Sequence, residues 1–157
     1  MTPAIEAVKR AKIPFTIHQY RHDPSAKSFG EEAAQSLGLN PERVFKTLIA
    51  SADGHRGRLV VAVIPVDKHL DLKALASVVD AKRMAMADET DAERTTGYVV
   101  GGISPLGQRK RLPLILDESA LRHDTIYVSA GRRGLEIELA PHDLIRLSAG
   151  KSAPIAR

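Results

Sequence analysis

A lysine inside an apolar segment is the first residue that could carry chemistry. Lys46 lies in the sequence VFKTLIAS, residues 44–51. On a β-strand, alternate residues face opposite sides, so Lys46 would share a face with Val44 and Leu48, and neither face is polar throughout. A lysine is almost never fully buried without a partner. Two interpretations therefore stay open: Lys46 extends to water at a strand end, or it projects into a cleft to bind phosphate or stabilise a developing negative charge.

A glycine-rich loop followed by a basic block is the second candidate. Residues 97–113 read GYVVGGISPLGQRKRLP, with Gly101 and Gly102 adjacent and the block RKR at 109–111. Adjacent glycines let backbone N–H groups approach a ligand closely, and such groups can form an oxyanion hole or an anion cradle. On spacing alone an ordinary irregular turn is the simpler explanation, because the segment matches neither the GxGxxG nor the Walker A pattern.

The remaining reactive side chains form no recognisable site. Of the six histidines only His18 and His22 have i,i+4 spacing, and they fall on a predicted strand and its exit, where that spacing does not bring side chains together. Nothing supplies a third ligand, so we expect no metal. Ser104 and Ser129 lack a GxSxG elbow and a linked histidine or aspartate. The absence of cysteine excludes a cysteine nucleophile, disulfides and thiolate metal sites.

Composition narrows the class of protein. A chain of 157 residues with 43% hydrophobic and 27% charged residues is typical of one globular domain, here 1–157. The net charge of +4 favours an anionic partner, but 4% aromatics and no tryptophan argue against an aromatic platform for base stacking. The charged N-terminus is not a signal peptide, and no uncharged stretch approaches the ~18 residues of a membrane span. We therefore expect a cytoplasmic protein.

The elements that must position these residues are helices and strands interspersed without a regular βαβ rhythm. Thr2 and Pro3 predict a helix start, and a Ser28–Glu31 capping box predicts another that ends near Gly38. The segment TIYVSAGRRGLEIELA, residues 125–140, predicts a hairpin around a basic turn flanked by glycines. Further strands are predicted at 15–20, 44–51, 58–66 and 113–117, a turn at 53–57, and helices at 72–79, 88–97 and 141–148. The pattern indicates an α+β domain with a mixed or closed sheet; the tail SAPIAR is uninformative.

Several long segments together resemble the YbaK family of free-standing aminoacyl-tRNA deacylases, which are related to the editing insertion domain of bacterial prolyl-tRNA synthetases. The resemblance runs over nearly the whole chain without visible insertions. It is carried by the segments TPAIEAVKRAKIPFTIHQYRHDP, VFKTL, PVDKHLDLKALA, GYVVGGISPLGQRKRLP and IYVSAGRRGLEIELAPHDL. It implies a mostly antiparallel sheet closed like a barrel and surrounded by short helices.

The resemblance also implies a reaction and a site, without a cofactor. Family members hydrolyse the ester of cysteine mischarged onto proline tRNA, and the substrate's own thiol attacks the carbonyl, which explains the missing nucleophile. By position, Lys46 and Gly101 are the catalytic residues. Tyr20, Thr47, Ser129 and Glu136 fall where members line the pocket, Glu136 where relatives often carry aspartate. Two alternatives stay open: the protein deacylates alanyl-tRNA(Pro) with water as the nucleophile, or it is a tRNA-binding module without catalysis.

The basic clusters predict how the tRNA acceptor end is held, although solvated surface is the usual explanation of any isolated cluster. We expect phosphate contacts from Arg109, Lys110, Arg111, Arg132 and Arg133. Three or four such contacts would give a salt slope of roughly −3, from about −0.7 to −0.9 per phosphate. Attachment of this kind is weak and blind to sequence, so a partner must select the tRNA. The resemblance suggests prolyl-tRNA synthetase for that partner.

Overall fold

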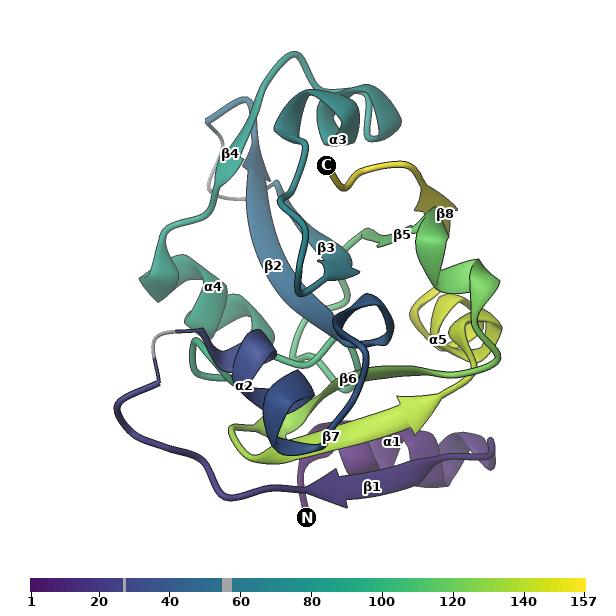
Figure 1. The fold of residues 1–157 in the computed structure, drawn as a ribbon. Helices are drawn as coiled ribbons and strands as arrows, with labels where there is room; N and C mark the ends of the chain where they lie inside the picture. The colour runs from purple at the N-terminus through teal and green to yellow at the C-terminus, as the bar shows by residue number, and fades with distance from the viewer. Residues whose placement is uncertain (27, 55–57) are drawn as a thin grey trace.

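The computed structural model describes residues 1–157 except residues 27 and 55–57 (Figure 1). In this part of the chain, eight strands form two sheets, with five α-helices and two short 3₁₀ helices around them. The α-helices are α1 (Pro3–Ala11), α2 (Phe29–Ser36), α3 (Leu72–Val78), α4 (Glu89–Thr96) and α5 (Pro141–Ser148), and the 3₁₀ helices are η1 (Pro41–Arg43) and η2 (Glu118–Arg122). The strands are β1 (Thr16–Gln19), β2 (Phe45–Ala52), β3 (Leu59–Pro65), β4 (Met84–Met86), β5 (Leu114–Asp117), β6 (Ile126–Arg132), β7 (Leu135–Leu139) and β8 (Lys151–Ala153).

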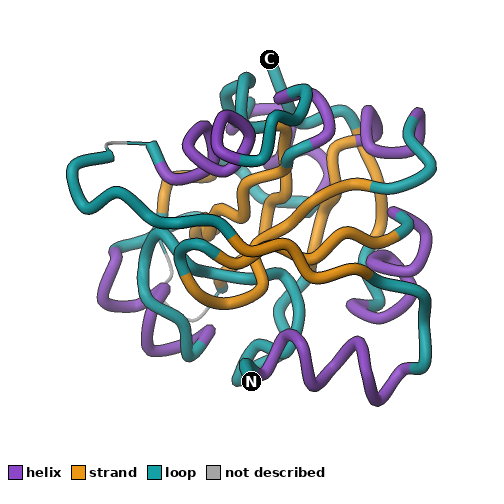
Figure 2. Tube along the Cα trace, turned by 60° about the horizontal axis from the view of Figure 1, so that its bottom comes forward, coloured by secondary structure: helices purple, strands orange, loops and turns teal. Residues whose placement is uncertain are grey.

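The larger sheet is mixed and the smaller one is antiparallel. The larger has the order β4-β2-β3-β5-β8, in which β2 is antiparallel to β3 and β4, and β5 is parallel to β3 and β8. The smaller has the order β1-β7-β6 and lies across the lower part of the molecule in Figure 1. Helices surround both sheets, and the two chain ends lie on opposite sides of the molecule (Figure 2). The α+β class is therefore confirmed.

The expected closed, barrel-like sheet is wrong. Among the described strands, the two sheets are joined only by an isolated bridge between Val44 and Tyr127. The reason lies in the edges of the larger sheet, because β4 and β8 are three residues long and offer too few backbone groups to pair onward. β1 instead extends the β6–β7 hairpin as a separate sheet.

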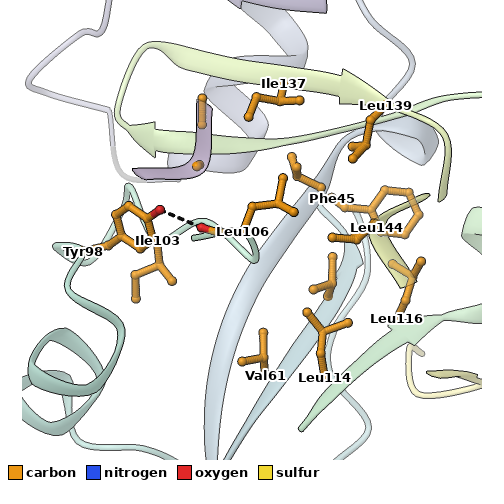
Figure 3. Close-up of a cluster of buried hydrophobic side chains, with 14 of the residues drawn as sticks. Phe45, Val61, Tyr98, Ile103, Leu106, Leu114, Leu116, Ile137, Leu139 and Leu144 are labelled. Atoms are coloured by element: carbon orange, nitrogen blue, oxygen red, sulfur yellow. Dashed lines mark hydrogen bonds between the residues drawn. The ribbon is translucent and has the colours of Figure 1, made fainter. Parts of the chain in front are cut away.

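An apolar core lies between the two sheets and fixes the glycine-rich loop. Phe45 of β2, Val61 of β3 and Ile137 of β7 belong to one buried cluster (Figure 3). Tyr98, at the start of the loop, is buried in the same cluster and donates a 2.6 Å hydrogen bond to the Leu106 carbonyl. Burial raises the pKa of Tyr98 to about 12, so it donates as a neutral phenol. The loop is thereby held from its first residues by the core.

Local signals account for most of the elements. Thr2 caps α1 by accepting from Ile5 N–H at 3.2 Å, and Asp71 caps α3 by accepting from Ala74 N–H at 3.0 Å. The 125–140 hairpin and the 141–148 helix are confirmed. The Ser28 capping box is wrong in one respect, since α2 begins after Ser28 but the serine side chain forms no cap hydrogen bond. Part of the predicted 53–57 turn lies outside the described residues. No described helix has the length and apolar character needed to cross a membrane.

Candidate functional site

A cavity of about 460 Å³ opens where β2, α2, the glycine-rich loop and the β6–β7 hairpin meet. All of the residues predicted for catalysis and substrate binding line it, together with two of the predicted phosphate contacts: Tyr20, Lys46, Thr47, Gly101, Ser129, Arg132, Arg133 and Glu136. Phe29 and Gly30 of α2 line it too, and sequence reasoning missed both. Segments far apart in the chain therefore build one site.

Lys46 lies in the cavity wall and is half-buried. It pairs in register with Ile64 of β3, and α2 packs directly beside it. A Cβ on Gly30 would lie 3.7 Å from Lys46 Cβ but only 2.5 Å from Val66 Cγ1, so only glycine lets α2 approach the segment after β3 this closely. Burial lowers the pKa of Lys46, and the carboxylates of Glu31 and Asp67 partly oppose that shift. No carboxylate forms an ion pair with Lys46 in the described chain, which leaves its charge available to a ligand.

The glycine-rich loop presents backbone to the same cavity. Gly101 has φ +93°, a conformation that favours glycine. The N–H groups on either side are used, since Val100 donates to Glu93 Oε2 at 2.7 Å and Gly102 donates to the Val99 carbonyl at 2.9 Å. Within the described residues the Gly101 N–H has no acceptor. One backbone donor thus remains for a ligand, which is what an oxyanion-stabilising loop requires.

The lining of the cavity also includes a buried carboxyl group. Glu136 on β7 pairs in register with Ser129 on β6 and is only 6% exposed. Across the described chain it forms no hydrogen bond or ion pair. Burial raises the pKa of Glu136 to about 8. Tyr20, whose N–H donates to the Gly134 carbonyl at 2.9 Å, has a pKa raised by burial and by the nearby Glu136 carboxylate.

Thr47 and Ser129 use their hydroxyl groups differently. Thr47 Oγ1 is buried and has no hydrogen-bond partner among the residues described. Ser129 Oγ donates to the Gly102 carbonyl at 3.2 Å and accepts from the Gly131 N–H at 3.1 Å, so it ties the glycine-rich loop to the hairpin. Buried polar groups are nearly always paired in native proteins. The unpaired Thr47 hydroxyl and Glu136 carboxyl are therefore typical of a site that binds a polar ligand.

Replacement of Glu136 by glutamine should remove a pH-dependent loss of folding stability. Burial raises the pKa of Glu136 to about 8 in the folded protein, from an ordinary value of 4.5. The folded state therefore retains a proton that the unfolded state loses, and the free energy of unfolding falls as pH rises from 4.5 to about 8. The full effect is on the order of 5 kcal/mol. E136Q should lack this fall and be more stable than wild type at pH 9 in urea unfolding.

Glu138 provides a matched control for this substitution on the same strand. Partial burial raises its pKa, but hydrogen bonds from Thr125 and His18 outweigh that effect and hold the pKa below its ordinary value. Glu138 therefore stabilises the protein at neutral pH and loses that contribution as pH falls. E138Q should be less stable than wild type at pH 7. Identical pH–stability curves for E136Q and wild type would contradict the buried, unpaired state of Glu136.

The two basic clusters lie in different places. Arg132 and Arg133 line the cavity. The 109–111 block does not: Arg109 Nη1 donates to the Arg94 carbonyl at 3.4 Å, near the end of α4, and Arg111 Nη2 donates to the Leu147 carbonyl at 3.1 Å on α5. Lys110 is exposed between them. The prediction that all five basic residues contact phosphates stays a prediction, and only two of them border the cavity.

The two histidines with i,i+4 spacing each contact a different glutamate. His18 Nε2 lies 2.9 Å from Glu138 Oε1, and His22 Nδ1 lies 2.8 Å from Glu32 Oε1. Glu32 also accepts from the Asp23 N–H at 2.8 Å and so fastens the segment after β1 to α2. No cluster of three His, Asp or Glu side chains suited to a metal occurs in the described ranges.

Comparison with known proteins identifies the family. Residues 23–147 match the aminoacyl-tRNA editing domain. The chain belongs to this family. The matched range contains Lys46, Gly101, Ser129 and Glu136, and it includes the whole β6–β7 hairpin and most of α5. The cavity described above is therefore the candidate active site of an aminoacyl-tRNA editing domain.

Individual relatives of the editing domain fall into several groups. EbsC of Enterococcus faecalis, provisionally assigned as a Cys-tRNA(Pro)/Cys-tRNA(Cys) deacylase, is 41% identical over 154 residues, which span 98% of this chain and 92% of EbsC. ProXp-y of Escherichia coli K12, a multifunctional Ser/Thr-tRNA deacylase, is 29% identical over 66% of this chain and 63% of its own. A crystal structure of a candidate trans-editing enzyme for prolyl-tRNA synthetase has a TM-score of 0.81 at 20% identity, with coverage of 100% of this chain and 99% of that one. The last likeness establishes the fold.

Proposed function

We propose that this editing domain deacylates Cys-tRNA(Pro) and that the substrate's thiol is the nucleophile. The 41% identity to EbsC supports the substrate. The observation that carries the mechanism is the state of the hydroxyl groups in the cavity. Ser129 is hydrogen bonded to backbone groups, and Thr47 has no partner among the described residues, so neither is paired there with a histidine or carboxylate that could activate it. A nucleophile supplied by the substrate fits a cavity without an activated residue of its own.

The proposed reaction balances without a cofactor. The substrate sulfur bonds to the ester carbonyl carbon, and the bond from that carbon to the ribose oxygen breaks. The thiol proton passes to the ribose oxygen, which releases the tRNA, and water then opens the resulting cyclic thiolactone to cysteine. Intramolecular attack in a fixed geometry can reach an effective molarity of ~10⁵ M or more. The protein therefore needs only to orient the thiol and stabilise the oxyanion.

The cavity residues are assigned roles in this scheme. Lys46 and the Gly101 N–H orient the terminal ribose ester and stabilise negative charge on its carbonyl oxygen. Tyr20, Thr47, Ser129 and Glu136 shape the space for the aminoacyl group. Shape alone would reject a similar side chain by only roughly 1–3 kcal/mol. A requirement for a thiol in the chemistry excludes proline and alanine regardless of fit.

One observation favours a second candidate, hydrolysis of Ala-tRNA(Pro) by water. Glu136 is buried, unpaired in the described chain and has a pKa raised to about 8, and a carboxyl group that titrates near neutral pH can serve as a general base. In that scheme Glu136 would take a proton from water as the water attacks the ester. The thiol-assisted scheme has no need of a base in this position, so the two schemes predict different substrates.

A few contacts between basic side chains and phosphates would bind tRNA weakly and without regard to sequence, so a partner is needed to select the tRNA. We propose that the tRNA(Pro) acceptor end binds at the cavity beside Arg132 and Arg133 and that prolyl-tRNA synthetase supplies the choice of tRNA. A protein of this kind would act in the cytoplasm, where the substrate is made. Strong discrimination by the purified protein between tRNAs that carry the same amino acid would contradict the need for the synthetase.

Release of free cysteine from Cys-tRNA(Pro) tests the proposed function. Purified protein should accelerate loss of the aminoacyl ester far above the spontaneous rate, with uncharged tRNA as the second product. Binding of the same tRNA is measured in parallel by fluorescence anisotropy. Normal binding with no acceleration for any mischarged tRNA would show a tRNA-binding module without catalysis and would overturn the proposal.

A further inference from the structure

Arg133 is fixed at the cavity mouth by two contacts. It follows β6 in the hairpin turn, and its Cζ lies 4.0 Å from the ring centroid of Phe29, the first residue of α2. Its Nη2 donates a 2.7 Å hydrogen bond to the Val100 carbonyl in the glycine-rich loop. Although Arg133 is exposed, its guanidinium is held between two elements that both line the cavity.

Gly101 lies directly against the same pair. A Cβ on Gly101 would come within 2.4 Å of Arg133 Nε and 2.8 Å of Phe29 Cδ2. Arg133 Nε and Nη2 therefore both lie next to Gly101, and Nη2 is bonded to Val100. The guanidinium lies over the ring of Phe29. Because Arg133 is exposed, the side of its guanidinium away from Phe29 is open to a ligand.

The charge of Arg133 is not neutralised by the protein. No carboxylate lies within ion-pair distance of its guanidinium in the described part of the chain. A planar cation with an open face is a stacking surface for a nucleobase. A phosphate would instead seek the N–H groups, one of which is bonded to the Val100 carbonyl. The contact of the guanidinium with the Phe29 ring points to a base, and the salt dependence of binding distinguishes the two.

We infer that Arg133, backed by Phe29, stacks on the base of the 3′-terminal nucleotide of the tRNA. This inference rests on the proposed function, because it places the ester beside Gly101. The ester and the terminal base are attached to the same ribose, so the group in contact with Gly101 at the cavity mouth is the one that meets the base. The inference replaces the phosphate contact that sequence reasoning assigned to Arg133. It also supplies a stacking site in a chain poor in aromatic residues.

The test compares two uncharged RNA hairpins that carry the acceptor stem and end in CCA. One has a normal terminal adenosine and the other an abasic terminal nucleotide. Wild type should bind the normal RNA roughly tenfold more tightly, as expected for one stacked base. R133K keeps the charge but loses the planar group, so it should bind both RNAs equally, at the wild-type affinity for the abasic RNA and with an unchanged salt slope.

Arg122 is the matched control. It is an exposed arginine at the end of η2, outside the cavity, and its guanidinium has no hydrogen bond or ring contact in the described residues. R122K should keep the wild-type preference for the normal RNA. Equal binding of both RNAs by wild type, or a preference that persists in R133K, would overturn the inference. Weaker binding of both RNAs by the same factor in R133Q, which removes the charge, with a reduced salt slope and the preference retained, would indicate a phosphate contact and would overturn it too.

The binding assay separates this inference from the proposed function, because both RNAs are uncharged. If wild type prefers the normal RNA, R133K does not, and the protein has no deacylase activity, the proposed reaction is wrong and the stacking site stands. If the protein deacylates the substrate but binds both RNAs equally, the stacking site is wrong and the proposed reaction stands. Thermal unfolding of R133K should match that of wild type within a few degrees, since the substitution is at an exposed side chain.

Discussion

Replacement of Lys46 by alanine should reduce single-turnover deacylation of Cys-tRNA(Pro) by on the order of 10²–10³-fold, the usual cost of removing one group that stabilises an oxyanion. Lys46 is the cation of β2 that lines the cavity, and it forms no ion pair within the described chain. Its loss leaves the developing charge with the Gly101 N–H alone. Binding of the tRNA should change much less, because the basic groups at the mouth remain.

Lys68 is the matched control for this substitution. It carries the same charge, lies just after β3 and is exposed outside the cavity. K68A should therefore deacylate at close to the wild-type rate. Urea unfolding of K46A should show a cooperative transition, which would show that its loss of activity is not caused by unfolding. Turnover by K46A at the wild-type rate, with normal tRNA binding, would remove Lys46 from the mechanism.

Replacement of Gly101 by alanine should also abolish most of the activity, by roughly 10²-fold or more, because a 1 Å displacement of a positioning group can cost that much. Alanine disfavours the φ of +93° found here. Its Cβ would also meet Arg133 Nε at 2.4 Å and Phe29 Cδ2 at 2.8 Å. The loop must then shift away from the ester or the Arg133–Phe29 contact must open.

Gly54 is the control that separates the effect of the positive φ from the effect of the close contacts. It has a similar φ of +72°, but a Cβ there would meet nothing within 4 Å among the described residues. G54A should therefore show the backbone cost alone, about 1 kcal/mol in stability, with unchanged deacylation. G101A should lose activity beyond what its stability loss explains. Equal and small effects in both variants, measured as single-turnover rates and unfolding free energies, would show that the close packing at Gly101 has no part in catalysis.

Local signals in the sequence predict the elements that depend on neighbouring residues. Thr2 and Pro3 begin α1, Pro141 begins α5, and the glycines around Arg132 and Arg133 mark the hairpin turn. Lys46 could be found because it interrupts an otherwise apolar strand, where a lysine needs either water or a function. The family resemblance is what assigns the roles that spacing alone leaves open.

The features that were missed depend on residues far apart in the chain. The stack of Arg133 on Phe29 and the close approach of Gly30 to Val66 have no local signature. The tail SAPIAR looked uninformative, yet Ile155 is fully buried, and its N–H donates to Asp117 Oδ1 at 3.0 Å. The expected closure of the sheet is wrong for the same reason, because strand pairing at the edges is set by non-local contacts.

Deacylation of Cys-tRNA(Pro) and Ala-tRNA(Pro), measured side by side, distinguishes cleavage by the substrate thiol from attack by water. The two substrates differ in the thiol that the mechanism requires and share the tRNA, the ester and the contacts at the mouth. If the thiol is the nucleophile, wild type releases cysteine rapidly, K46A loses that release, and neither accelerates loss of the alanyl ester. Hydrolysis of the alanyl ester at a comparable rate would show that water attacks in this cavity and would contradict thiol-assisted cleavage.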